Sequence, residues 1–360
     1  MVLVGSRGES MNKKGMVVGI TLLFVGTSIN SIIAQDLEKS PQPTSMGNWL
    51  YVGGSGPGNY TRIQDAIDNA SDGDTVFVFG KSSPYNEHLS IDKSITLQGE
   101  DKTTTMIDGM SNICADYVVV TDIMFWKWGP AVAITNSSNF IIENCDFNDS
   151  IAGIVIKNSM DGVIRNCTFL NETNVIWCLV SIWDSDKIEI SYCDFLNSVS
   201  GFMPSLIDIY HSGGITIHHC TFTRNYGFII QVHASRGIMI HHCNFTDNYG
   251  GGVQIFTSDV QFTSNNFINN SKPGVELVFL WVCDLRDNWW GAPQGPSINF
   301  TTLSSIYTVH SAITIRDIKD GDIVNFYGIT SIGRFLRLIV LLPRLYPWFS
   351  EPVPDAGSHR

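Results

Sequence analysis

Asn144-Cys145-Asp146-Phe147 opens a series of similar tetrads between Ile141 and Asn270. The series continues with Asn166-Cys167-Thr168-Phe169, Tyr192-Cys193-Asp194-Phe195, His219-Cys220-Thr221-Phe222 and His242-Cys243-Asn244-Phe245, and Asn265-Asn266-Phe267 closes it. The aromatic position recurs, at spacings of 22, 22, 26, 27, 23, 22 and 22 residues, at Phe125, Phe147, Phe169, Phe195, Phe222, Phe245, Phe267 and Trp289. A period in the low twenties is typical of a solenoid, in which each unit buries its apolar face only by stacking on its neighbours.

The repeats contain short runs in which apolar and polar residues alternate, such as Ile154-Val-Ile156, Ile207-Asp-Ile209 and Ile238-Met-Ile240. Alternation rich in β-branched residues and interrupted by Ser, Asn, Asp and Gly predicts β-strands. Leucine-rich repeats are excluded, because their Leu spacing and helical half are missing. Calcium-binding nonapeptide repeats are excluded because no Gly-Gly-x-Gly-x-Asp run occurs.

Two or three short strands per turn, returning to register after about 22 residues, describe a parallel β-helix with coils roughly 4.8 Å apart. From roughly Trp49 to Ser297, the sequence resembles the right-handed, pectin-lyase-like β-helix repeat proteins of the secreted or cell-surface type. We therefore predict an all-β fold, a single-stranded right-handed parallel β-helix of about nine coils. This repeat specifies the fold and no single function.

The two ends of the repeat region carry their own signals. Within Thr61 to Ala70, apolar residues fall at helical spacing, which predicts an amphipathic helix that caps the open strand edges of the first coil. This opening resembles the start of pectinesterases and of many secreted β-helix surface proteins. Asp287 to Ser297, with its Asn-Trp-Trp-Gly-x-Pro pattern, resembles the final rung of those surface proteins. Residues 298–360 are predicted to form a C-terminal cap or tail.

The N-terminal residues predict export from the cytoplasm. Lys13-Lys14 precedes the apolar run Gly15 to Ser28, and small or polar residues surround Ala34-Gln35, which indicates a secretory signal over residues 1–35. The run is short for a membrane span, although a retained anchor helix is the alternative. Residues 36–48 are predicted to be a linker, and either Met1 or Met11 is the start. The mature chain is expected to be secreted or attached to the cell surface, without a membrane span.

Composition narrows the class of partner. The 360 residues suit one long domain, because a solenoid has no size limit set by a single core. The formal net charge is −12, which disfavours nucleic acid and anionic membranes as partners. The same charge repels uronic-acid polymers unless a cation intervenes.

Five cysteines occupy the same place in consecutive repeats and are expected to stack as a column. The coil spacing is compatible with disulfides, but the five cysteines of the column are an odd number. The same position is Ile123 in the coil before the column and Asn265 in the coil after it. Packed free thiols are the alternative, and metal ligation is disfavoured because zinc needs ligands that close around one point. The column comprises Cys145, Cys167, Cys193, Cys220 and Cys243.

Two outward columns are predicted on the strands that precede each cysteine, because residues next to inward-facing Ile or Val point out. Aromatic rings beside amides suit a polysaccharide, since sugars present apolar faces to rings and hydroxyls to polar groups. Strand propensity and cross-strand stacking are the competing explanation. The predicted carbohydrate-binding residues are Trp183, Tyr210, His233, Phe256, Gln231 and Gln254. The favoured function is non-catalytic binding of an extracellular polysaccharide or glycan, or adhesion.

Catalysis in a groove on this outer face is an alternative, as a polysaccharide lyase, hydrolase or epimerase. The resemblance to pectinesterases and pectate lyases does not extend to their catalytic motifs. Glycosidases need paired carboxylates about 5 to 9.5 Å apart, and Asp184, Asp186 and Asp208 lie on adjacent coils. These three residues are the catalytic candidates.

Histidines on adjacent coils provide a third alternative. His218 and His241 are 23 residues apart and both are predicted to face outward, as in a copper or zinc pair. The repeats also resemble those of the periplasmic copper-binding β-helix family linked to nitrous-oxide reductase maturation. Stacked surface imidazoles without metal are the competing explanation. The sequence predicts no cofactor, and it leaves Ca²⁺, copper and zinc open.

Overall fold

The computed structural model describes residues 47–126, 129–149, 152–170, 178–199, 205–256, 258–271, 274–278, 283–285, 287–290, 298–304, 307–313, 323–329, 335–341 and 356–357. The predicted signal peptide and most of the predicted linker lie outside these residues.

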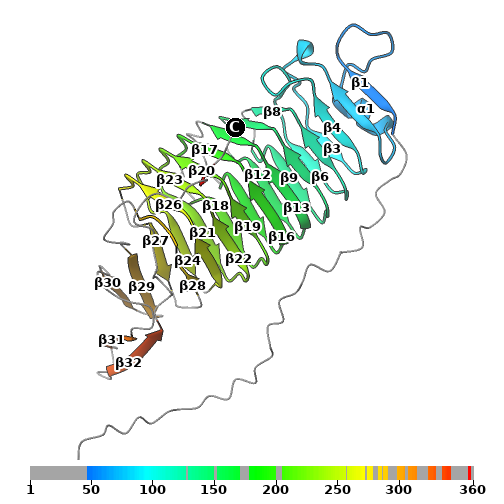
Figure 1. The fold of residues 1–360 in the computed structure, drawn as a ribbon. Helices are drawn as coiled ribbons and strands as arrows, with labels where there is room; N and C mark the ends of the chain where they lie inside the picture. Colours follow the sequence, from blue (N-terminus) through cyan, green and yellow to red (C-terminus); the bar gives the residue numbers. More distant parts are fainter. Residues whose placement is uncertain are drawn as a thin grey trace, which may run out of the picture. The chain divides into compact units, whose positions relative to one another are not determined.

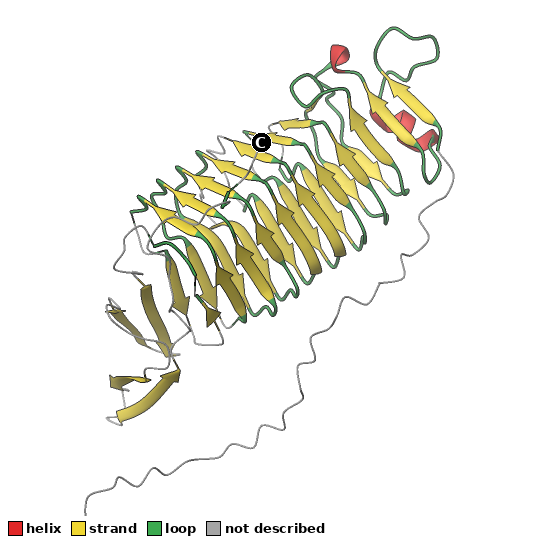
Figure 2. Ribbon diagram, in the orientation of Figure 1, coloured by secondary structure: helices red, strands yellow, loops and turns green. Residues whose placement is uncertain are grey.

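Three parallel sheets, here called A, B and C, form the walls of a solenoid, and from β7 to β27 the chain visits them in turn (Figures 1 and 2). Sheet A contains β1 (Trp49–Val52), β2 (Thr75–Val78), β4 (Thr96–Gly99), β7 (Val119–Thr121), β10 (Ile141–Glu143), β13 (Met160–Arg165), β16 (Asp186–Ser191), β19 (Thr216–His218), β22 (Ile238–His241), β25 (Val260–Thr263) and β28 (Cys283–Asp284). The predicted all-β parallel solenoid of about nine coils is confirmed.

Sheets B and C complete each coil. Sheet B contains β5 (Met106–Ile107), β8 (Met124–Trp126), β11 (Asp146–Asn148), β14 (Thr168–Leu170), β17 (Asp194–Leu196), β20 (Thr221–Thr223), β23 (Asn244–Thr246) and β26 (Asn266–Ile268). Sheet C contains β3 (Leu89–Ile91), β6 (Ser111–Ile113), β9 (Val132–Thr135), β12 (Ile154–Lys157), β15 (Val180–Trp183), β18 (Ser205–Tyr210), β21 (Phe228–His233), β24 (Val253–Phe256), β27 (Val275–Val278), β29 (Ile298–Ser304) and β30 (Tyr307–Ile313).

The repeated phenylalanines form a continuous stack inside the solenoid. Successive rings from Phe125 to Phe267 have centroids 4.6 to 5.2 Å apart and planes within 14° of parallel. The stack ends on Trp290, whose ring lies 5.0 Å from that of Phe267. The sequence had placed Trp289 there, but Trp289 pairs with Asn266 and so lies one position too early for the stack.

The cysteine column lies beside this stack and consists of free, fully buried thiols. Each thiol contacts backbone carbonyls, as when Cys220 Sγ donates to the oxygens of Ile190 and His218 at 3.6 and 3.3 Å. Burial raises the pKa of the Cys220 thiol well above its ordinary value. In the coil after Cys243, Asn265 takes over the position, and its side-chain amide donates to the Ile240 carbonyl of the coil before at 2.9 Å. The column is therefore a structural spine.

The predicted capping helix is present as α1 (Ile63–Asn69), which packs against β1, β2 and β3 with its apolar face buried. Glu87 accepts hydrogen bonds from the first backbone amides of the helix at 2.9 and 3.2 Å, and Lys93 Nζ donates to three carbonyls at its end at 3.1, 2.7 and 2.9 Å. Gln64 Oε1 also accepts from Ser90 N of β3 at 2.8 Å. The helix thus covers the first strands, and Gln64 pairs with the backbone of Ser90 on the edge strand of sheet C. A short 3₁₀ turn (Gly80–Ser82) follows β2.

At the other end, sheet C continues past Ser297, since Ile298 pairs with Val275 in parallel register. β30 then runs antiparallel to β29, and β31 (Ile323–Ile329) pairs antiparallel with β32 (Phe335–Leu341). Among the described residues, no helix has the length and apolarity that crossing a membrane requires.

Candidate functional site

Two columns of side chains line the outer face of sheet C. We call Lys157, Trp183, Tyr210, His233 and Phe256 the ring column. We call Val155, Ser181, Asp208, Gln231, Gln254 and Glu276 the polar column. The residues within each column are direct partners on successive strands, as the sequence predicts. The alternating Ile and Val residues are buried, which turns the intervening side chains outward.

The rings of the ring column are partly exposed, and the first three are tilted relative to one another. The Trp183 and Tyr210 centroids are 6.4 Å apart at 56°, and those of Tyr210 and His233 are 6.0 Å apart at 46°. His233 stacks on Phe256 at 4.3 Å and 9°. Tyr210 is 42% exposed, so its ring is available to a ligand.

Asp208 lies at the centre of this face. Trp183 Nε1 donates to its Oδ2 at 3.3 Å, and His233 Nε2 lies 3.5 Å from its Oδ1. The Asp208 side chain is only 17% exposed. Burial raises the pKa of Asp208, whereas the charge of His233 and the Trp183 hydrogen bond oppose that rise. Burial also lowers the pKa of His233, which Asp208 opposes. The two groups form a half-buried acid–base pair.

The rest of the polar column is a ladder of amides. Gln231 Nε2 donates to Gln254 Oε1, and Gln254 Nε2 donates to Glu276 Oε2 at 3.0 Å. Ser181 and Gln231 are 3% and 5% exposed although they lie on the outward side. Sequence alternation had predicted that they face out and gave no sign of this burial.

The three predicted catalytic carboxylates do not gather. Asp184 lies in the turn after β15, half-exposed, with Oδ1 3.8 Å from His211 Nδ1. Asp186 begins β16 and is exposed on sheet A, whereas Asp208 contacts Trp183 and His233 on sheet C. Of the three, only Asp208 has a largely buried carboxylate that contacts a tryptophan and a histidine.

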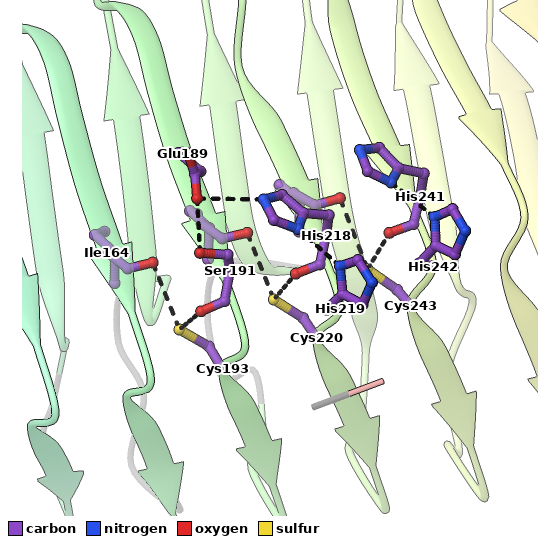
Figure 3. A network of polar contacts seen from close by, with 12 residues as sticks. Ile164, Glu189, Ser191, Cys193, His218, His219, Cys220, His241, His242 and Cys243 are labelled. Atoms are coloured by element: carbon purple, nitrogen blue, oxygen red, sulfur yellow. Dashed lines mark hydrogen bonds and ion pairs between the residues drawn. The ribbon is translucent and has the colours of Figure 1, made fainter. Parts of the chain in front are cut away.

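A second cluster lies at the end of the sheet A strands, where four imidazoles form two stacked pairs (Figure 3). His218 stacks on His241 at 5.2 Å, and His219 stacks on His242 at 5.1 Å. Within each coil the Nδ1 atoms of consecutive histidines are 2.8 and 2.9 Å apart, and Glu189 Oε1 lies 3.2 Å from His218 Nε2. The sequence prediction had used only His218 and His241.

This cluster does not form a metal cage in the structure. Across the described part of the chain, no group of three or more His, Cys, Asp or Glu side chains is arranged to hold a metal ion. Burial, reinforced by the other three imidazoles, lowers the pKa of His241 to about 4. Copper or zinc binding at His218 and His241 remains a prediction.

A cavity of about 390 Å³ lies near the first coil and not over the columns of sheet C. Tyr51 and Phe79 contribute stacked rings to its lining, and Lys81 and Glu100 contribute opposite charges. The sequence prediction named none of the residues that line this cavity as a binding or catalytic residue.

A family comparison identifies the architecture. The model of the right-handed β-helix region matches residues 107–206 and 180–313, which together cover more than half of the chain. A comparison with curated protein sequences found no match.

Solved structures with similar folds have low sequence identity. The A-module of a mannuronan C-5 epimerase from Azotobacter vinelandii is 15% identical, with a TM-score of 0.50 over 67% of this chain and 75% of that one. An alginate lyase from Paenibacillus is 13% identical, with a TM-score of 0.49 over 67% and 95%. A surface adhesin of Streptococcus pneumoniae is 12% identical, with a TM-score of 0.38 over 78% and 95%.

Proposed function

The chain belongs to the right-handed β-helix family, and within it we propose a secreted or cell-surface protein that binds an extracellular carbohydrate on the outer face of sheet C. The observation that carries this proposal is the pairing of two columns, since partly exposed rings run beside hydrogen-bonding groups over four successive coils. The signal-like residues Lys13 to Ser28 support export.

The chemistry of the face fits a sugar chain. Apolar sugar faces pack on rings such as Trp183 and Tyr210, while hydroxyls exchange hydrogen bonds with Asp208 and the partly exposed Gln254. Because coils are spaced about 4.8 Å apart, a chain that crosses the strands meets a new ring and a new polar group at each coil. Many weak contacts of this kind add up to useful affinity without an enclosed pocket.

A glycan array tests this proposal. Wild-type protein is expected to bind at least one glycan class, and Trp183→Ala is expected to lose most of that binding. Trp49→Ala is the matched control, because Trp49 is an exposed ring on sheet A, 52% accessible and away from the columns. The proposal fails if Trp183→Ala binds as wild type does, or if both variants lose binding equally.

Catalysis at the same face is a second candidate, favoured by the contact between Asp208 and His233. The carboxylate of Asp208, 3.5 Å from His233 Nε2, favours the tautomer with the proton on Nε2 and the lone pair on Nδ1, as an acid–base residue requires. A lyase, hydrolase or epimerase would release products or convert residues in a panel of polysaccharides. Asp208→Asn would then abolish that turnover. A protein that only binds gives no product, either as wild type or as Asp208→Asn.

A further inference from the structure

We propose that the outer face of sheet B carries a peptide-binding site, that the chain's own residues Ala356 and Gly357 occupy it, and that the site requires glycine. We call these two residues the latch. Asn244 on β23 and Ala356 are 112 residues apart in the sequence, so their contact is tertiary docking and not a local turn. The site lies on a different sheet from the proposed carbohydrate-binding face and does not depend on it.

Two hydrogen bonds hold the single peptide group that joins Ala356 to Gly357. Asn244 Nδ2 donates to the Ala356 carbonyl oxygen at 2.6 Å, and the Gly357 amide donates to the His242 carbonyl oxygen at 2.7 Å. Asn244 Oδ1 in turn accepts from Asn266 Nδ2 at 2.9 Å, which keeps the Asn244 donor turned towards the latch. Both polar atoms of the peptide group are therefore recognised, whatever side chains flank it.

The fit around Gly357 excludes a side chain. Gly357 is buried and has a φ of 98°, a positive value that favours glycine. A Cβ atom at this position would lie 2.3 Å from Asn244 Nδ2 and 3.2 Å from Thr221 Oγ1. The site thus selects glycine through the space that it denies to every other residue.

The latch lies on the outward side of sheet B. Thr221 and Asn244 are direct partners on β20 and β23, and each precedes a phenylalanine of the inner stack. Asn266, the next partner on β26, is only 4% exposed although it also lies on the outward side. A ligand cannot lie over Thr221 and Asn244 while the latch is bound, so the latch controls access to this part of sheet B.

Binding within one chain explains why few contacts suffice. Residues 342–355 alone separate the latch from β32. A short tether holds its end at an effective concentration of about 1 mM, whereas two hydrogen bonds give a separate peptide little affinity. The site is therefore expected to be filled by the chain itself and not by a second copy.

Hydrogen exchange at the Gly357 amide, resolved by fragmentation mass spectrometry of the full chain, tests the inference. Wild-type protein is expected to exchange this amide at least tenfold more slowly than a synthetic peptide of residues 351–360. Gly357→Ala keeps the amide but adds the Cβ atom, and is expected to exchange as fast as the peptide with the same substitution. Gly58→Ala is the matched control and should leave the Gly357 amide protected, because it also places alanine at a positive φ, 84°, but with nothing within 4 Å of the new Cβ atom.

A second pair of variants tests the side-chain donor. Asn244→Asp keeps an acceptor for Asn266 but replaces the donor to the latch with a carboxylate oxygen, and is expected to lose most of the protection at Gly357. Asn148→Asp makes the same change on β11, three strands from β20 in sheet B, and is expected to keep the protection. Equal exchange in the two variants would overturn the role of Asn244.

Three further results would overturn parts of the inference. A wild-type Gly357 amide that exchanges as fast as the free peptide excludes docking of the latch. Protection that persists in Gly357→Ala excludes the requirement for glycine. Protection that falls when the protein is diluted assigns the bound segment to a second copy instead of the same chain.

Discussion

The phenylalanine stack inside the solenoid and the ring column on sheet C follow the same coils but differ in composition. The inner position holds Phe in seven successive coils, whereas the outer one changes from Lys to Trp, Tyr, His and Phe. Stacking on a neighbouring coil favours identical rings, and it explains the inner column. It does not explain five different side chains in a row, so we infer that the outer column is shaped by what it contacts in solution.

The largest expected effect separates the columns by stability. Phe195→Ala removes a fully buried ring from the middle of the stack and is expected to cost about 3–5 kcal/mol. Phe256→Ala, a partly exposed ring on the outer face, is the control and is expected to cost less than half as much. Urea denaturation measures both, and equal losses would remove the contrast between the columns.

A smaller effect is expected at the buried asparagine ladder beside the stack. Asn248 is 2% exposed, donates to the Phe222 carbonyl at 3.0 Å and accepts from the Asn225 amides at 3.0 and 3.2 Å. Asn248→Ala leaves these partners unpaired and is expected to cost about 2–3 kcal/mol. Asn112→Ala, on the outward side of β6, is the control and should change the denaturation midpoint little. A midpoint that is unchanged in Asn248→Ala would show that the ladder is dispensable.

The histidine cluster gives the smallest effect, and it depends on pH. The pKa of His241 is about 4 in the folded state and about 6.5 when unfolded. As the pH falls from about 6.5 to about 4, His241 binds a proton in the unfolded state but not in the folded state, so the free energy of unfolding decreases. After allowance for solvent screening, we expect a loss of about 1 kcal/mol between neutral pH and pH 4 that His241→Asn reduces. Melting temperatures of the wild type and of His241→Asn between neutral pH and pH 4 measure this loss. An identical pH dependence in the two proteins would contradict the lowered pKa of His241.

The sequence period predicted the fold and the register of the columns, because each coil must return identical residues to the same place to bury its apolar side. It misplaced the last ring at Trp289, since the Phe spacing does not reveal the one-residue shift that brings in Trp290. It did not foresee the buried Gln231 or the contacts of Asp208, because alternation reports only the side of a strand. The period placed Asp186 and Asp208 on adjacent coils, but it did not show that the two residues lie on different sheets.

Carbohydrate binding on the outer face of sheet C is tested most directly by calorimetry with the best glycan found on the array. Tyr210→Ala is compared with Tyr249→Ala, since both rings are exposed, at 42% and 54%, and only Tyr210 belongs to the ring column. We expect Tyr210→Ala to weaken binding at least tenfold at an unchanged melting temperature, while Tyr249→Ala binds as wild type does. Equal affinities for the two variants would contradict a binding site on this face.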